Sequence, residues 1–148
     1  MGTVVLVDAV KFEALKTIPL GKSGVIKPMA VLLSSDATRL NVSTGRWQQV
    51  FKVDTATQTI LGSVTVGKRP WGIALSPDAK TLYSATGPPN NISVVNRADY
   101  TVVATIPART GPWGLIVLLR WPSLAVTDVK IETSPKVVLA ELRWVYSS

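Results

Sequence analysis

The sequence predicts an all-β fold made of repeated four-stranded units, and three observations carry this prediction. Pro28, Pro70 and Pro112 stand 42 residues apart, each next to a short apolar run. The segments between them contain further short runs rich in β-branched residues, separated by turns with Gly, Pro, Asn or Asp. A period of about 40–45 residues that holds four short strands is typical of β-propeller blades. The predicted fold class is therefore all-β, with four-stranded antiparallel propeller blades in an incomplete propeller.

The clearest repeat is the blade predicted at residues 70–111. Its four strands are expected at 72–76, 82–86, 92–96 and 101–106. Between them lie a Ser-Pro-Asp turn, a Gly-Pro-Pro-Asn segment and an Arg-Ala-Asp turn, none of which continues a strand. Pro19 and Pro107 fall at equivalent places in fourth strands. Because proline cannot donate to a sheet ladder, the fourth strand is expected at the outer edge of its blade.

The segment 28–69 is predicted to be a second blade of the same plan, with strands near 29–33, 39–43, 50–54 and 59–66. Residues 1–27 are expected to hold half a blade and an inter-blade loop. Their two apolar runs, 4–8 and 14–20, match the third and fourth strands of the next block at an offset of 46 residues. Inner strands are expected at 29–33, 72–76 and 114–118.

Three segments in order, Val53–Thr57, Lys68–Tyr83 and Val102–Pro107, resemble the YVTN-type β-propeller repeat family. The resemblance covers residues 3–117. It implies a wheel of about seven blades, often in periplasmic or extracellular bacterial or archaeal proteins, with no single shared activity. The chain lacks the Gly-His and Trp-Asp pairs of the WD-repeat family, so that related pattern does not apply.

The segment 112–148 is predicted to begin a further blade and then to depart from the repeat. Arg120 stands 42 residues after Asp78, where a turn former is expected. The loss of register indicates either a frameshifted or truncated reading frame or a diverged terminal repeat. Residues 136–146 fit both a strand and an amphipathic helix, and their periodicity does not separate the two.

The chain of 148 residues holds fewer blades than the four that the smallest propeller ring needs. It is therefore expected to be a fragment of a larger propeller, or to close a ring by self-association. No apolar stretch reaches the roughly 20 residues of a membrane span, and the first residues lack the basic and apolar pattern of a secretory signal. The compartment of this chain is not assigned by the sequence.

The chain contains no histidine and no cysteine, which removes the usual general base, the commonest zinc ligand and all thiolate chemistry. No glycine-rich phosphate loop is present. Asp36 and Asp78 recur at one turn, where a capping role is expected rather than calcium binding. From these absences we expect no enzyme activity, no metal and no cofactor for this chain.

The net charge of +7 is sorted by loop class. The loops after the second and fourth strands of each blade share one face, and all of their charged residues are basic. These residues are Lys22, Lys27, Arg46, Lys68, Arg69 and Arg109. The loops on the other face hold five aspartates and three basic residues: Asp8, Asp36, Asp54, Asp78 and Asp99, and Lys11, Lys80 and Arg97. A cationic face suits an anionic ligand, and the candidate anion-binding residues are Arg46, Lys68, Arg69 and Arg109.

A second interpretation gives these residues only structural roles. The basic residues would then keep the protein in solution, and the two Pro-Trp-Gly triplets would pack neighbouring blades against each other. The triplets are Pro70, Trp71 and Gly72, and Pro112, Trp113 and Gly114.

Two functions follow from the sequence. The leading one is a non-catalytic propeller scaffold that binds a protein or a polyanionic ligand, without a specific nucleic-acid module. The alternative is a fragment of a propeller enzyme, lactonase-like or cytochrome nitrite reductase-like, whose catalytic residues lie in other blades. The fold itself does not indicate an activity, because propellers host many unrelated functions. The alternative function is therefore implied by the resemblance alone.

Overall fold

A computed structural model describes residues 2–21, 26–118 and 138–142 of the chain. Within these ranges every regular element is a β-strand, and all strand pairs are antiparallel. The predicted all-β fold class is thereby confirmed. No helix long and apolar enough to cross a membrane occurs in these residues.

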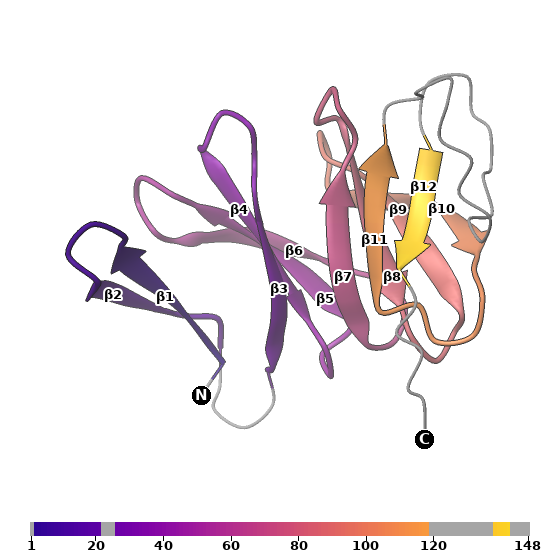
Figure 1. Ribbon diagram of the computed structural model, residues 1–148, viewed down its shortest axis with the longest axis horizontal. Coiled ribbons are helices and arrows are strands. Elements are labelled where there is room, and N and C mark those ends of the chain that lie inside the picture. The colour runs from indigo at the N-terminus through magenta and orange to yellow at the C-terminus, as the bar shows by residue number, and fades with distance from the viewer. Residues whose placement is uncertain (1, 22–25, 119–137, 143–148) are drawn as a thin grey trace.

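Two complete four-stranded sheets form the centre of the molecule (Figure 1). The first blade contains β3 Pro28–Leu33, β4 Arg39–Thr44, β5 Gln49–Asp54 and β6 Ile60–Thr65. The second blade contains β7 Pro70–Leu75, β8 Thr81–Thr86, β9 Asn91–Asn96 and β10 Thr101–Pro107. In both, the order of strands across the sheet is their order in the sequence.

A two-stranded sheet lies on either side of the two blades (Figure 1). The N-terminal hairpin pairs β1 Thr3–Asp8 with β2 Glu13–Pro19. The C-terminal pair joins β11 Gly114–Leu118 to β12 Val138–Leu142. The first strands of successive sheets, β3, β7 and β11, are neighbours in space, as the inner strands of a propeller are.

The backbone repeats as closely as the sequence does. Positive φ angles between 53° and 67° occur in four pairs of residues that stand 42 positions apart. The pairs are Ala37 and Ala79, Gln48 and Asn90, Gln58 and Tyr100, and Arg69 and Gly111. Only the last pair places a glycine where the left-handed conformation costs least. The turns therefore impose this backbone on whichever residue occupies the position.

The fourth strand of each unit carries an extra residue that interrupts the ladder. Leu15, Leu61 and Val103 are skipped in the pairing of β2, β6 and β10 with their neighbours. All three side chains are about half exposed, at 58%, 48% and 59%. A bulge at this place twists the edge of a sheet away from further strands, which discourages pairing with other chains.

The hydrophobic core consists of three clusters, each between two successive sheets. Between the N-terminal hairpin and the first blade lie Ile18, Leu20, Ile26, Val42, Phe51 and Val53. Between the two blades lie Val50, Val64, Val66, Ile73, Leu82, Val95 and Tyr100. Between the second blade and β11 lie Ala85, Ile92 and Leu115. Alternate residues of a strand serve opposite faces of its sheet, so each blade is buried by both neighbours.

Candidate functional site

Five exposed basic residues lie on loops at one end of the sheets. Because strands alternate in direction, the loops after β2, β4, β6 and β10 emerge at the same end as the loop between β8 and β9. We call this surface the cationic rim, and its residues are Lys27, Arg46, Lys68, Arg69 and Arg109. The described part of these loops contains no Asp or Glu. Lys22, also predicted here, lies outside the described residues.

Backbone hydrogen bonds join each loop of the cationic rim to the next. The four donors and acceptors are Gly45 N to Lys27 O at 2.9 Å, Val66 N to Gln48 O at 2.8 Å, Gly87 N to Arg69 O at 3.3 Å, and Ala108 N to Asn90 O at 2.8 Å. A fifth bond, from Gly111 N to the side-chain oxygen of Asn90, adds to the last link. The loops that carry the cations are thus held as one continuous surface across the two blades.

Trp71 and Trp113 form a stacked pair near the start of β7 and of β11. Their ring centroids are 4.1 Å apart with an interplanar angle of 26°. Trp71 also lies over a glycine of its own blade, because a Cβ added to Gly87 would be 2.7 Å from Cζ3 of the ring. Met29 holds the equivalent place in the first blade and lies over Gly45 in the same way. This stack places the predicted packing residues between successive inner strands.

Three other residues of the Pro-Trp-Gly triplets, Pro70, Pro112 and Gly72, are closely packed. Pro70 and Pro112 are fully buried. Gly72 allows β7 to approach β11, since a Cβ added there would lie 2.6 Å from the Cα of Gly114. The contact joins backbone to backbone, so a larger residue at Gly72 would push the two inner strands apart.

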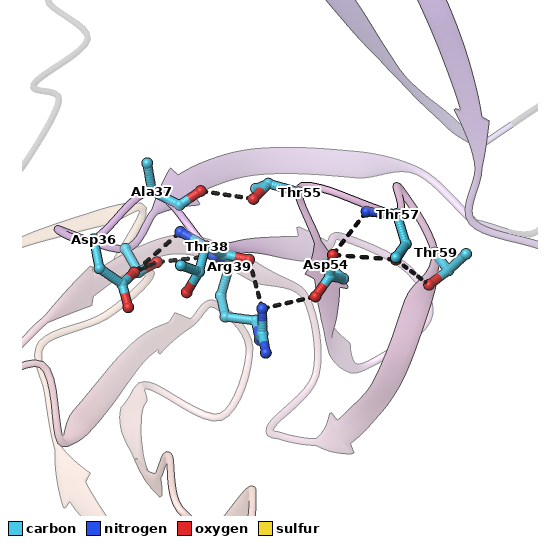
Figure 2. A network of polar contacts seen from close by, with 9 residues as sticks. Asp36, Ala37, Thr38, Arg39, Asp54, Thr55, Thr57 and Thr59 are labelled. Carbon is cyan, nitrogen blue, oxygen red and sulfur yellow. Dashed lines mark hydrogen bonds and ion pairs between the residues drawn. The ribbon is translucent and has the colours of Figure 1, made fainter.

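The opposite end of the blades carries aspartates that organise turns (Figure 2). Asp36 Oδ1 accepts hydrogen bonds from the Ser34 hydroxyl at 2.5 Å and from the Thr38 amide at 3.1 Å. In the second blade, Asp78 Oδ1 accepts from the Ser76 hydroxyl at 2.6 Å and from the Lys80 amide at 3.1 Å. The two turns are therefore built alike.

These hydrogen bonds change the acidity of the aspartates. Donation by the Ser34 hydroxyl, with help from the Thr38 amide, lowers the pKa of Asp36 to about 2. The pKa of Asp78 is lowered for the same reason, first by the Ser76 hydroxyl. Both groups are solvent-exposed, and hydrogen bonding to the charged form explains the direction of the shift.

A second set of contacts ties the turn after the third strand to the turn after the first. In the first blade, Thr55 donates its hydroxyl to Ala37 O at 2.6 Å (Figure 2). In the second blade, the Arg97 guanidinium donates to Ala79 O. The residues 42 positions apart thus make the same link with different side chains. Arg97 was grouped with the loop charges from sequence, but its side chain is engaged in this turn.

The first blade adds an ion pair that the second blade lacks. Arg39 Nη1 donates to Asp54 Oδ2 at 2.7 Å, and the Thr57 amide donates to Asp54 Oδ1 at 2.8 Å (Figure 2). Hydrogen bonding by Thr57, and then the charge of Arg39, lowers the pKa of Asp54. Thr81 and Asn96 occupy the equivalent positions of the second blade.

The aspartates do not assemble into a metal site in the described residues. No group of three or more His, Cys, Asp or Glu side chains lies close enough together to hold an ion there. Their oxygens accept hydrogen bonds within the turns instead, which is the capping role expected from sequence.

One polar cluster between the blades was missed by sequence reasoning. Asn41, which is fully buried on β4, accepts a hydrogen bond from the Tyr100 hydroxyl at 3.3 Å. The Lys52 ammonium lies 4.5 Å from the centre of the Tyr100 ring, and burial raises the pKa of Tyr100. A signal was present, because Asn41 stands between Leu40 and Val42 in the strand expected at 39–43, and a buried asparagine requires a partner.

Comparison with solved structures places these blades among propeller proteins. The chain is similar to a hydrazine synthase from Kuenenia stuttgartiensis, with a TM-score of 0.70 and 26% identity over 76% of this chain and 32% of that one. A functionally unknown protein from Desulfotomaculum acetoxidans matches with a TM-score of 0.63 and 16% identity, over 78% of this chain and 38% of that one. The dihydro-haem d1 dehydrogenase NirN matches with a TM-score of 0.59 and 20% identity, over 72% and 22%.

The chain thus spans about a third of the hydrazine synthase chain that it matches. The antiparallel four-stranded sheets and these propeller-type neighbours agree on the fold. No family model matches the sequence, and no curated protein matches it either.

One expectation is corrected by this comparison. The absence of histidine and cysteine led us to expect no enzyme activity for this chain, yet two of the matching structures are enzymes, a hydrazine synthase and a dehydrogenase. The physical reason is that the structural and the reactive residues of a repeat protein can lie in different repeats. Blades that carry no reactive side chain still build the wheel on which other residues act.

Proposed function

We propose that this chain forms part of the propeller of an enzyme whose reactive groups lie outside the described residues, and that its repeats are of YVTN type. The observation that carries the proposal is the likeness to hydrazine synthase, at a TM-score of 0.70 over 76% of the chain. The regular 42-residue pattern of left-handed turns supports the assignment of the repeats.

The contribution of the described blades is structural in this proposal. Their inner strands meet through the Trp71–Trp113 stack and the close approach of Gly72 to Gly114. Such contacts fix the spacing of successive blades around an axis. Groups on other blades would then be held at set distances from one another, as catalysis requires.

Of the two enzyme classes that the sequence suggested, we favour the cytochrome nitrite reductase-like one over the lactonase-like one. Its support is that one matching structure is a dehydrogenase named for dihydro-haem d1. The present chain does not fit a haem-binding role by itself. It has no histidine and no cysteine to serve as the usual iron ligands, and those ligands would come from other blades.

The test is to read the coding DNA on both sides of this segment in all three frames and to express the chain with the flanking blades. We expect further repeats and a cluster of His or acidic residues at one mouth of the channel. The purified longer protein should show a haem absorption band, and a His or acidic cluster without haem would instead favour the lactonase-like class. Plain repeats without such a cluster, and a purified protein without cofactor, would overturn the enzyme proposal in favour of a binding scaffold.

A further inference from the structure

The two ends of the blades carry opposite charge. The six carboxylates of the sheets from β1 to β10 lie on loops, or at strand ends beside loops, of the end opposite to the cationic rim: Asp8, Glu13, Asp36, Asp54, Asp78 and Asp99. Among the described residues Glu141 is the exception, because it lies on β12 and pairs with Leu115 near the start of β11. The rim has five exposed cations and, in the described part of its loops, no carboxylate. Charges of one sign gathered on one surface attract an oppositely charged ligand more strongly than scattered ones do.

The rim cations occur on successive loops that are joined to one another. Lys27, Arg46, the pair Lys68 and Arg69, and Arg109 follow in order around the edge, and the loop-to-loop hydrogen bonds connect their backbones. The backbone of Arg69 lies in a tight turn with a left-handed conformation, and the buried Pro70 that follows anchors this turn to the blade. An extended ligand with charges at regular intervals could therefore contact several loops at once without ordering a mobile surface.

An aromatic side chain stands among these charges. Trp47 follows Arg46 directly, in the loop between β4 and β5, and its side chain is 46% exposed. An indole ring offers a flat apolar face, which matches the C–H face of a sugar ring. The exposed indole adds an apolar contact surface to the charges of the cationic rim, which cations that only keep a protein in solution do not need.

We propose that the cationic rim is a binding site for an acidic polysaccharide, with sulfate or carboxylate groups that contact Arg46, Lys68, Arg69 and Arg109 and a sugar ring that contacts Trp47. The site does not depend on the enzyme proposal, because it uses only surface residues of the described blades. Arginine donates two parallel hydrogen bonds to a planar or tetrahedral anion, and lysine acts as a point charge.

The main experiment measures binding of the full chain to heparin oligosaccharides by titration calorimetry, over a series of salt concentrations. In the variant Lys68→Glu/Arg69→Glu we expect a loss of affinity of at least about tenfold near 50 mM salt. We also expect the slope of log Kd against log salt to fall by about two, since two contacts that release counterions are removed.

The matched control is Lys11→Glu/Lys80→Glu, which changes net charge by the same amount at the opposite end. Both lysines are exposed there, whereas Arg97 is unsuitable as a control because its guanidinium holds the turn at Ala79. Circular dichroism and thermal melting establish that both variants fold. Equal losses in the two variants would show that net charge alone governs binding and would overturn the proposal, as would no loss in either.

Two further arms decide the class of ligand. Trp47→Ala should weaken heparin binding at every salt concentration without changing the salt slope, because it removes an apolar contact. Polyglutamate and single-stranded oligo(dT) serve as competitors of similar charge. If either binds as tightly as heparin and loses the same affinity in Lys68→Glu/Arg69→Glu, the polysaccharide assignment is wrong.

Discussion

In the first blade, Ser43 links two sheets. Its hydroxyl donates to Trp71 O of the second blade at 2.7 Å and accepts from Ala30 N of its own blade at 3.1 Å. In the second blade the residue 42 positions later is Ala85, which has no hydroxyl and lies in the apolar cluster against β11. The same place in the repeat is thus polar at one interface and apolar at the next.

The inner strands differ in the same sense. Ala30, Gly72 and Gly114 are equivalent residues. A Cβ added to Gly72 would meet the backbone of Gly114, whereas one added to Gly114 has no described atom within 4 Å, and Ala30 carries a Cβ already. The turns, by contrast, are nearly identical, as the hydrogen bonds of Asp36 and Asp78 show. The comparison teaches that local hydrogen bonding is common to the repeats, while contacts between blades are particular to each interface.

The largest loss of stability is expected when Gly72, on the inner strand of the second blade, is replaced by alanine, the residue at the equivalent position 30 of the first blade. Gly72→Ala would place a Cβ 2.6 Å from the Cα of Gly114, and backbone atoms cannot yield as a side chain can. We expect a loss of about 3 kcal/mol in the free energy of unfolding, measured in urea. Gly62→Ala is the control, since no atom lies within 4 Å of its added Cβ, and a change beyond about 0.5 kcal/mol there would contradict this reasoning.

The reverse exchange gives the first blade a residue of the second. Ser43→Ala leaves Trp71 O and Ala30 N without the hydroxyl that joined them, in a fully buried position. Unpaired buried polar groups cost about 1–2 kcal/mol in the free energy of unfolding. Urea unfolding of Ser43→Ala beside the exposed control Ser63→Ala measures this cost, and equal stability of the two variants would show that the link between blades contributes nothing.

A smaller effect is expected from the ion pair that distinguishes the turns. Arg39→Thr introduces the residue of the second blade and removes the 2.7 Å contact with Asp54. Because the Arg39 side chain is 37% exposed, the folding equilibrium constant should fall less than about fivefold at low salt. The difference from the parent protein should vanish in 1 M NaCl, and its persistence there would mean that packing rather than charge was lost.

The smallest change concerns acidity. The folded-state pKa of Asp36, about 2, is below the ordinary value of 3.8, so its carboxylate stabilises the fold above that value and this contribution is lost as pH falls toward 2. Ser34→Ala should raise the pKa of Asp36 and leave that of Asp78 unchanged, as followed by carboxyl carbon NMR signals. A shift of both aspartates would show that the two turns are coupled.

Much of the fold could be predicted because the repeat places turn formers at fixed intervals. The strand expected at 72–76 begins earlier, at Pro70, which pairs with Thr86 across a bulge that contains Trp71 and Gly72. Sequence alone does not reveal such a bulge, since it depends on how the neighbouring strand is registered.

The candidate site was less accessible to sequence reasoning. The topology of a blade is enough to predict on which face each charged loop lies. The contact of Asn41 with Tyr100 joins residues 59 positions apart, and it depends on the offset between two sheets. Arg97 looked like one more surface charge because the carbonyl that it binds, that of Ala79, has no signature in sequence. The departure from the repeat after residue 118 falls mostly outside the described residues.

The order of strands in each blade has a consequence for how the chain folds. Within each of the two blades, neighbouring strands are consecutive in the sequence, so each blade can form from contacts separated by few residues, which are the fastest to form. Contacts between sheets join residues about one repeat apart, and they stabilise the fold only after two sheets have formed. Folding can therefore start at either blade and spread to its neighbours, as in other linear arrays of repeats. Amide hydrogens of β4, β5, β8 and β9, which have a strand on both sides, should consequently exchange last with solvent.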